Sequence, residues 1–233
     1  MPNISGILFD KDGTLFDFQA TWGVWTAWVL KTLADGDAEL ENRMAQSVGF
    51  DLKGGRFEAS SLVIAGTPLE IAQALAGPLG HSDPAALLAT LDSLAAATPQ
   101  VEVTPLAALF SKLKARGLDL GIATNDSEAP ARAHLEAANV TRYLDFIVGS
   151  DSGYGGKPEA GQLHGFCTAM SLAPEQCMMV GDSTHDLGAG RAAGFYTVGV
   201  LTGPATHDVL QPLADVVLPS IAELPGHLDQ IAG

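Results

Sequence analysis

The chain has 233 residues, of which 47% are hydrophobic and 17% charged, and its formal net charge is −15. This length suits one domain of about 150 residues that carries an insert, and the composition is that of a globular protein rather than a disordered one. Because binding to nucleic acid or to anionic membranes depends on Lys and Arg, the negative charge argues against both classes of partner.

The first predicted element is a buried strand at 5–10 (SGILFD), which ends in an acid and runs into the tight loop DKDGT. Asp10 and Asp12 are spaced i, i+2, which places both carboxylates near the same side of an extended loop. A lone buried carboxylate is costly, and a metal ion would offset the repulsion between the two. Gly13 would permit the sharp loop and let backbone N–H groups face an anion. Taken alone, the pattern also fits a plain polar turn.

Residues 18–99 indicate an all-helical insert between the first and second strands. The stretch is rich in Ala and Leu, and three of its residues are tryptophans at helical spacing: Trp22, Trp25 and Trp28. We expect these tryptophans to form the core of the insert rather than a platform for a ligand. A loop at 51–58 (DLKGGRFE) holds Arg56, which is the candidate for binding an anionic group such as a carboxylate, although a solvated turn would have the same pattern.

After the insert, strands and helices alternate, which predicts a parallel sheet covered on both faces. The predicted strands are 118–124, 146–149, 177–180, 195–200 and 214–218, and the predicted helices are 105–116, 127–138, 158–170 and 184–193. The expected fold is therefore α/β, with a Rossmann-like core at 1–17 and 100–233 and a second domain at 18–99.

Polar residues follow several of these strands, where sites form in open parallel sheets. Thr124 and Asn125 precede a helix N-terminus, which suits a phosphate. Lys157 lies in a glycine-rich loop and would stabilise charge on a transferring phosphoryl group. Asp182 would complete an oxygen cage for Mg²⁺, supported by Asp186 one helical turn later. Each of these residues, considered separately, also fits a helix cap or a surface position.

Other chemistry-bearing residues give weaker signals. His185 lies beside these acids, but we expect its side chain to point away from them. Cys167 and Cys177 have neither metal-binding nor redox spacing and are expected to be buried thiols. No secretory signal is recognisable and no apolar stretch reaches about 18 residues, so we expect a cytoplasmic protein.

The strand-end motifs occur in the order typical of the haloacid dehalogenase (HAD) superfamily, and the chain resembles its phosphoglycolate-phosphatase-like branch. The motifs are ILFDKDGTLFD at 7–17, IATND at 122–126, KP at 157–158 and VGDSTHDLGAGRAAG at 180–194. The insert after the first motif is similar to the helical C1 cap of that branch.

This resemblance implies catalytic roles for three residues. Asp10 would attack phosphorus and form an aspartyl-phosphate. Asp12 would protonate the leaving alcohol and then activate the hydrolytic water. Lys157 would neutralise charge on the nucleophile and the phosphoryl group.

The resemblance also implies the binding residues. Thr124 would bind phosphoryl oxygens with Asn125 nearby, and Gly13 would shape the first loop together with Thr14. Mg²⁺ would be held by the Asp10 carboxylate, the Asp12 backbone carbonyl and Asp182, with Asp186 in support.

The implied function is Mg²⁺-dependent hydrolysis of a small phosphomonoester, with phosphoglycolate favoured by the cap. The acid at Asp12 argues against dehalogenation, since dehalogenases of the superfamily lack it. A sugar phosphomutase uses the same two acids and stays an alternative. A non-catalytic HAD-like binding protein is disfavoured because every key residue is present. We expect a monomer that acts on a small phosphorylated metabolite.

Overall fold

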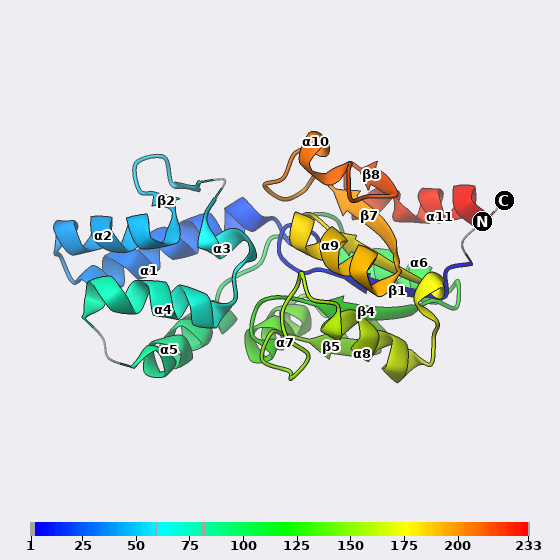
Figure 1. The fold of residues 1–233 in the computed structure, drawn as a ribbon, viewed down its shortest axis with the longest axis horizontal. Helices are drawn as coiled ribbons and strands as arrows, with labels where there is room; N and C mark the ends of the chain where they lie inside the picture. The colour runs from blue at the N-terminus through cyan, green and yellow to red at the C-terminus, as the bar shows by residue number, and fades with distance from the viewer. Residues whose placement is uncertain (1–2, 59, 81–82, 233) are drawn as a thin grey trace.

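The computed structural model describes residues 3–58, 60–80 and 83–232, which form two lobes (Figure 1). One lobe is built on a parallel sheet with strand order β5-β4-β1-β6-β7-β8. Its strands are β1 (Gly6–Phe9), β4 (Asp119–Ala123), β5 (Phe146–Val148), β6 (Cys177–Gly181), β7 (Tyr196–Val200) and β8 (Val216–Leu218). The predicted parallel α/β core is therefore confirmed.

The central position of β1 sets the location of the site. This strand pairs with β4 on one side and β6 on the other, so the strand order reverses beside it. In open parallel sheets, ligands bind in the crevice outside the carboxyl ends of the strands at such a reversal. The loops after β1, β4 and β6 meet there.

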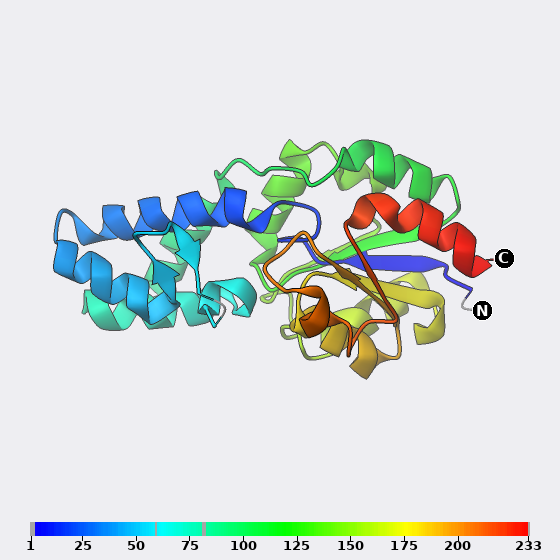
Figure 2. The same cartoon turned by 90° about the horizontal axis from the view of Figure 1, so that it is seen from above.

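Helices cover both faces of the sheet, as Figure 2 shows from above. Ile7 and Phe9 of β1 face the apolar cluster that contains residues of α6, α7 and α11, whereas Leu8 faces the cluster of α8 and α9. The helices are α6 (Leu106–Lys114), α7 (Glu128–Ala137), α8 (Gly161–Met170), α9 (Thr184–Ala193), α10 (His207–Leu210) and α11 (Leu224–Ala232). Helix α8 begins three residues later than predicted, so Pro158 lies in the preceding turn.

The insert forms the second lobe and has an apolar core of its own. After one turn of π-helix at Gln19–Gly23 come α1 (Val24–Ala34), α2 (Ala38–Val48), α3 (Leu62–Ala65), α4 (Pro68–Leu79) and α5 (Pro84–Ala96). Within the described residues, no helix combines the length and the apolar character that crossing a membrane requires.

The prediction that the insert is all-helical was wrong at one place. A two-stranded antiparallel hairpin joins β2 (Phe50–Asp51) to β3 (Arg56–Phe57). The rings of Phe50 and Phe57 lie 5.0 Å apart across it, and Gly55 has a φ of 61°, which suits the turn. Strands of two residues are too short to show an alternating pattern, so they could not be predicted from periodicity.

Two chain segments cross between the lobes side by side. The Asp17 N–H donates to the Val101 carbonyl at 2.8 Å, and the Val103 N–H donates to the Leu15 carbonyl at 3.0 Å. These crossings lie near the expected domain boundaries between 17 and 18 and between 99 and 100, and the exact boundaries stay a prediction.

Candidate active site

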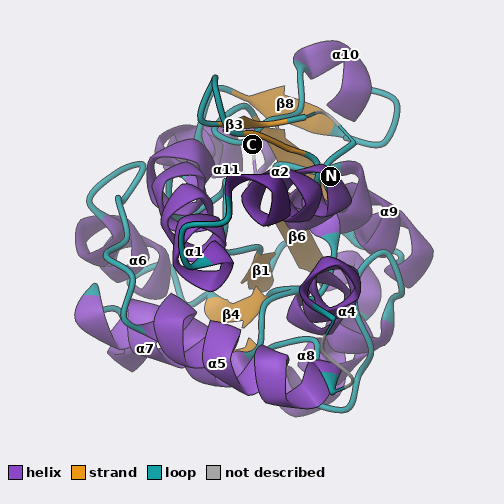
Figure 3. Cartoon of the chain, turned by 90° about the vertical axis from the view of Figure 1, so that its left-hand side faces the viewer, coloured by secondary structure: helices purple, strands orange, loops and turns teal. Residues whose placement is uncertain are grey.

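A cleft lies between the strand ends of the core and the inner side of the insert. Figure 3 looks onto the insert, with β1, β4 and β6 visible behind its helices. The core side of the cleft carries most of the predicted site residues: Asp10, Asp12, Thr124, Asn125, Lys157, Asp182 and Asp186. The topology thus brings together residues that lie far apart in the sequence, from Asp10 to Asp186.

Three buried carboxylates form the floor of the cleft. One oxygen from each of Asp10, Asp182 and Asp186 lies within 4.8 Å of the other two. Burial raises the pKa of Asp10 to about 7 against the opposing effect of Lys157, and burial also raises the pKa of Asp182 well above its usual value. Clustered oxygen ligands with this much uncompensated charge fit a hard divalent cation such as Mg²⁺.

Lys157 bridges two of these acids. Its Nζ lies 2.6 Å from Asp10 Oδ1 and 2.6 Å from Asp186 Oδ1, and its side chain is buried. The Asn125 side chain holds the Lys157 backbone at both ends, because Nδ2 donates to the carbonyl at 2.9 Å and Oδ1 accepts from the N–H at 2.7 Å. Asn125 therefore positions the lysine, a role that the sequence analysis did not assign to it.

Asp186 is held in place by the start of α9. Ser183 donates to Asp186 Oδ2 through both its N–H and its hydroxyl, at 3.0 and 2.6 Å, and accepts from the Asp186 N–H at 3.3 Å. This is a capping box, in which the helix terminus and the acid fix one another. Since Oδ1 faces Lys157, both oxygens are engaged, which fits the supporting role predicted for Asp186.

Thr124 ends β4 at the cleft. Its backbone N–H donates to the Val148 carbonyl at 3.1 Å, and its Oγ1 accepts from the Asp126 N–H at 3.1 Å. The residue is 1% exposed yet lines the cleft. The predicted contact between the Thr124 hydroxyl and a phosphoryl oxygen stays a prediction.

Gly13 lies in the loop after β1, and its own backbone N–H is engaged within that loop. That N–H donates to the Phe16 carbonyl at 2.7 Å within the loop. Gly13 has a φ of 81°, and a Cβ there would overlap the Asp182 carboxylate. Its carbonyl accepts from the Thr202 hydroxyl at 2.6 Å, while Thr14 donates to Asp182 Oδ1 at 3.3 Å. Gly13 thus shapes the space around Asp182.

The Asp12 side chain turns away from the acid cluster toward the insert. Its Oδ1 accepts from Trp22 Nε1 at 2.7 Å and from Lys11 Nζ at 2.8 Å. The expectation that the tryptophans form the core of the insert holds in part. Trp25 packs against the apolar core of the insert and Trp22 is buried with Phe18 and Ala95, but both also line the cleft, and Trp28 is 50% exposed. Helical spacing shows that the three tryptophans lie on one face of a helix, but it does not show which domain that face packs against.

Lys11 was not identified from the sequence, although it is fully buried beneath the first loop. Its Nζ lies 2.7 Å from Asp12 Oδ2, 3.3 Å from Asp126 Oδ2 and 3.3 Å from His134 Nδ1. Burial and Lys11 lower the pKa of His134 to about 4, so the neutral ring accepts from the lysine and donates through Nε2 to the Ala95 carbonyl at 2.8 Å. The sequence carries no local signal for these contacts, because His134 lies 123 residues away from Lys11 along the chain.

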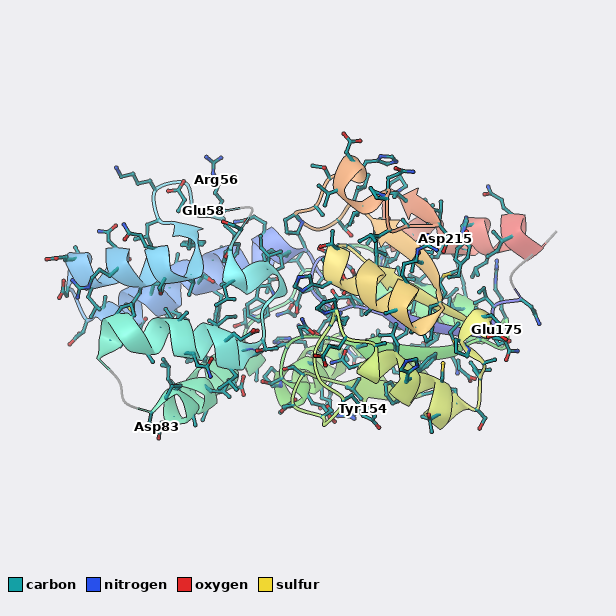
Figure 4. All side chains as sticks on the ribbon, in the orientation of Figure 1. Arg56, Glu58, Asp83, Tyr154, Glu175 and Asp215 are labelled. Carbon is teal, nitrogen blue, oxygen red and sulfur yellow. The ribbon has the colours of Figure 1, made fainter. Side chains whose placement is uncertain are left out.

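Two other predictions fail on geometry. Arg56 lies on the hairpin with 74% of its side chain exposed, 3.7 Å from Asp51 Oδ2, and Figure 4 shows it pointing outward at the edge of the insert. It is absent from the described residues that line the cleft. His185, which was expected to point away, lines the cleft, and its Nδ1 is buried without a hydrogen-bond partner.

Comparisons with known proteins agree with this arrangement. A family model for haloacid dehalogenase-like hydrolases matches residues 4–194. The chain is 31% identical to phosphoglycolate phosphatase of Rhodospirillum rubrum over 228 residues, which cover 94% of this chain and 88% of that protein.

Solved structures show the same fold at low identity. A predicted phosphoglycolate phosphatase from Haemophilus somnus has a TM-score of 0.70 and 17% identity, covering 98% of this chain and 99% of the other. The L-2-haloacid dehalogenase of Xanthobacter autotrophicus has a TM-score of 0.65 and 18% identity, covering 97% and 98%. A phosphatase and a dehalogenase thus share this fold, and the site residues must distinguish between the two chemistries.

Proposed function

The chain belongs to the haloacid dehalogenase-like hydrolase family, and we propose that it is a Mg²⁺-dependent phosphatase that cleaves a small phosphomonoester through an aspartyl-phosphate on Asp10. The observation that carries the proposal is the separation of two acids in one loop. Asp10 belongs to the acid cluster and forms an ion pair with Lys157. Asp12 lies outside the cluster, where it forms an ion pair with Lys11 and accepts a hydrogen bond from Trp22. This separation supports a nucleophilic role for Asp10 and a proton-transfer role for Asp12.

In the first step, an Asp10 oxygen attacks phosphorus and the bond from phosphorus to the ester oxygen breaks. Asp12 gives its proton to the departing oxygen. Lys157, 2.6 Å from Asp10, stabilises the negative charge on the transferring group together with the Thr124 hydroxyl. Bound by Asp10, Asp182 and the backbone at Asp12, with Asp186 in support, Mg²⁺ would offset the charge of these carboxylates and of the phosphoryl oxygens.

In the second step, Asp12 removes a proton from water, and the resulting hydroxide attacks phosphorus and releases phosphate from Asp10. The proton that Asp12 gave in the first step is thereby restored. An acid at this position supports phosphoryl transfer over dehalogenation. Phosphoglycolate is the first substrate to test, since it names the activity of the Rhodospirillum relative. We place the protein in the cytoplasm as a monomer.

The test is phosphate release with and without Mg²⁺ over phosphoglycolate, sugar phosphates, nucleotides and aryl phosphates. Asp10→Asn should lower kcat by about a thousandfold or more, because it removes the nucleophile. Asp35→Asn, an exposed acid in the insert, is the matched control and should leave kcat unchanged. Wild-type turnover by Asp10→Asn would refute the covalent mechanism.

A further inference from the structure

We infer that the cleft selects a phosphomonoester whose leaving group is uncharged and largely apolar, such as an aryl or benzylic alcohol, rather than one bearing a carboxylate. The inference depends on the proposed phosphatase function and names the substrate class of the same site. It follows from the side chains that the insert presents to Asp12.

The insert lines its side of the cleft mainly with aromatic and aliphatic side chains. They come from four segments of the insert and include Phe18, Trp22, Trp25, Ile64, Ile71 and Leu91. The rings of Trp22 and Trp25 meet edge to face at 5.2 Å, and Ile64 packs on the same cluster. Such a wall gains free energy by removing apolar surface of a ligand from water.

This wall begins at the acid that would protonate the leaving group. Trp22 Nε1 donates to Asp12 Oδ1 at 2.7 Å, so the indole is held directly beside that carboxylate. A leaving oxygen within reach of Asp12 therefore carries the rest of its alcohol toward Trp22 and its neighbours. The first atoms beyond the ester oxygen meet an aromatic surface.

The charges around the wall oppose a carboxylate on the leaving group. Asp92 of α5 lines the same side of the cleft, where it accepts from the Ser127 hydroxyl at 3.0 Å. Among the described residues that line the cleft, Lys157 is the one Lys or Arg, and its ammonium is paired with Asp10 and Asp186 on the floor. An organic anion against the wall would lose hydration beside Asp92 without gaining an ion pair.

The experiment compares pairs of esters that differ in one charge. They are benzyl phosphate with 4-carboxybenzyl phosphate, and ethyl phosphate with phosphoglycolate. We expect kcat/KM of the wild-type protein to favour the uncharged member of each pair by about tenfold or more. Equal values, or preference for the carboxylated esters, would overturn the inference.

Two variants test whether the wall causes the preference. Ile71→Arg adds a cation to the wall and should shift the ratio toward the carboxylated ester by about tenfold or more, whereas Gln73→Arg, exposed on the same helix, is the matched control and should leave the ratio unchanged. Asp92→Asn, which changes no volume, should shift the ratio in the same direction. An unchanged ratio in both cleft variants would show that the wall does not set the preference.

Binding separates this inference from the proposed function. If no ester is hydrolysed, the phosphatase proposal fails, and calorimetric titration with benzylphosphonate and 4-carboxybenzylphosphonate in the presence of Mg²⁺ still tests the cleft. Tighter binding of the uncharged phosphonate by about tenfold supports the inference. Equal or weaker binding of it contradicts the inference whatever the catalytic outcome.

Discussion

At the scale of single residues, Lys11 connects the loop after β1 to the rest of the molecule. It is fully buried between Asp12 and Asp126, with neutral His134 as its third neighbour. Burial raises the pKa of Asp126 to about 6 even though Lys11 lowers it, which shows how far these carboxylates depend on the lysine. The lysine thus fixes the orientation of the Asp12 side chain.

Lys11→Met should therefore destabilise the protein strongly. Removing one partner of a buried ion pair leaves uncompensated charge and typically lowers the free energy of unfolding by about 3–5 kcal/mol. Lys112→Met, an exposed lysine of α6, is the control and should change it by about 0.5 kcal/mol or less. Urea unfolding measures both variants, and similar small changes in the two would show that the Lys11 ion pairs contribute little.

At the scale of elements, two loops leave room for the Asp182 carboxylate. Gly13 in the loop after β1 and Gly203 in the loop after β7 both approach it so closely that a Cβ at either position would overlap its oxygens. Because Asp182 directly follows β6, three strand ends together fix the position of one proposed metal ligand. Glycine is required here by close approach and, at Gly13, also by its positive φ.

Gly203→Ala should lower the affinity for Mg²⁺ more than it lowers the stability of the fold. The added methyl group displaces Asp182, so we expect the Mg²⁺ concentration for half-maximal activity to rise by about tenfold or more. Gly226→Ala in α11, where a Cβ meets no atom within 4 Å, is the matched control. A Mg²⁺ titration of phosphate release measures the effect, and identical curves for the two variants would remove Gly203 from the metal site.

The elements that carry the site were predictable because their sequence signals are local. The strands β1, β4 and β6 are apolar runs that stop at Gly or a polar residue, and each agrees with its predicted range to within one residue at either end. Since parallel strands share a carboxyl edge, their terminal residues were expected to converge, and Asp10 and Asp182 do so.

The misses at Trp22 and Lys11 share one cause, which is contact between segments distant in sequence. The position of Trp22 beside Asp12 depends on how the insert docks, and the Lys11 contacts depend on α7 and on the end of α5. Arg56 was chosen for its chemistry in a flexible loop, but the hairpin directs it to solvent. Helical or alternating periodicity carries no information on such contacts between domains.

At the scale of the whole molecule, the buried acids make stability depend on pH. Burial raises the pKa of Asp10 to about 7 and that of Asp126 to about 6, so the folded state binds more protons than the unfolded state. Their contribution to stability is present below pH 4 or so and is lost as the pH rises through these values. His134, with its pKa lowered to about 4, acts in the opposite direction between that value and its usual 6.5.

Mg²⁺ should reverse the loss because it binds the deprotonated carboxylates. The rise in Tm caused by Mg²⁺ should therefore be larger at about pH 8 than at about pH 5.5. At a hundred times Kd the stabilisation is about 2.7 kcal/mol, which corresponds to about 5–10 °C for a chain of this length. Thermal unfolding with and without Mg²⁺ at both pH values measures the difference.

Since the net charge is −15, any cation screens repulsion in the folded state, and NaCl at matched ionic strength is the necessary control. Asp182→Asn should abolish the excess of the Mg²⁺ effect over the NaCl effect, because it removes a carboxylate from the cluster of three. A Mg²⁺ effect that is independent of pH, or that survives in Asp182→Asn, would mean that the ion binds elsewhere on the acidic surface, and the acid cluster would then serve catalysis without holding the metal.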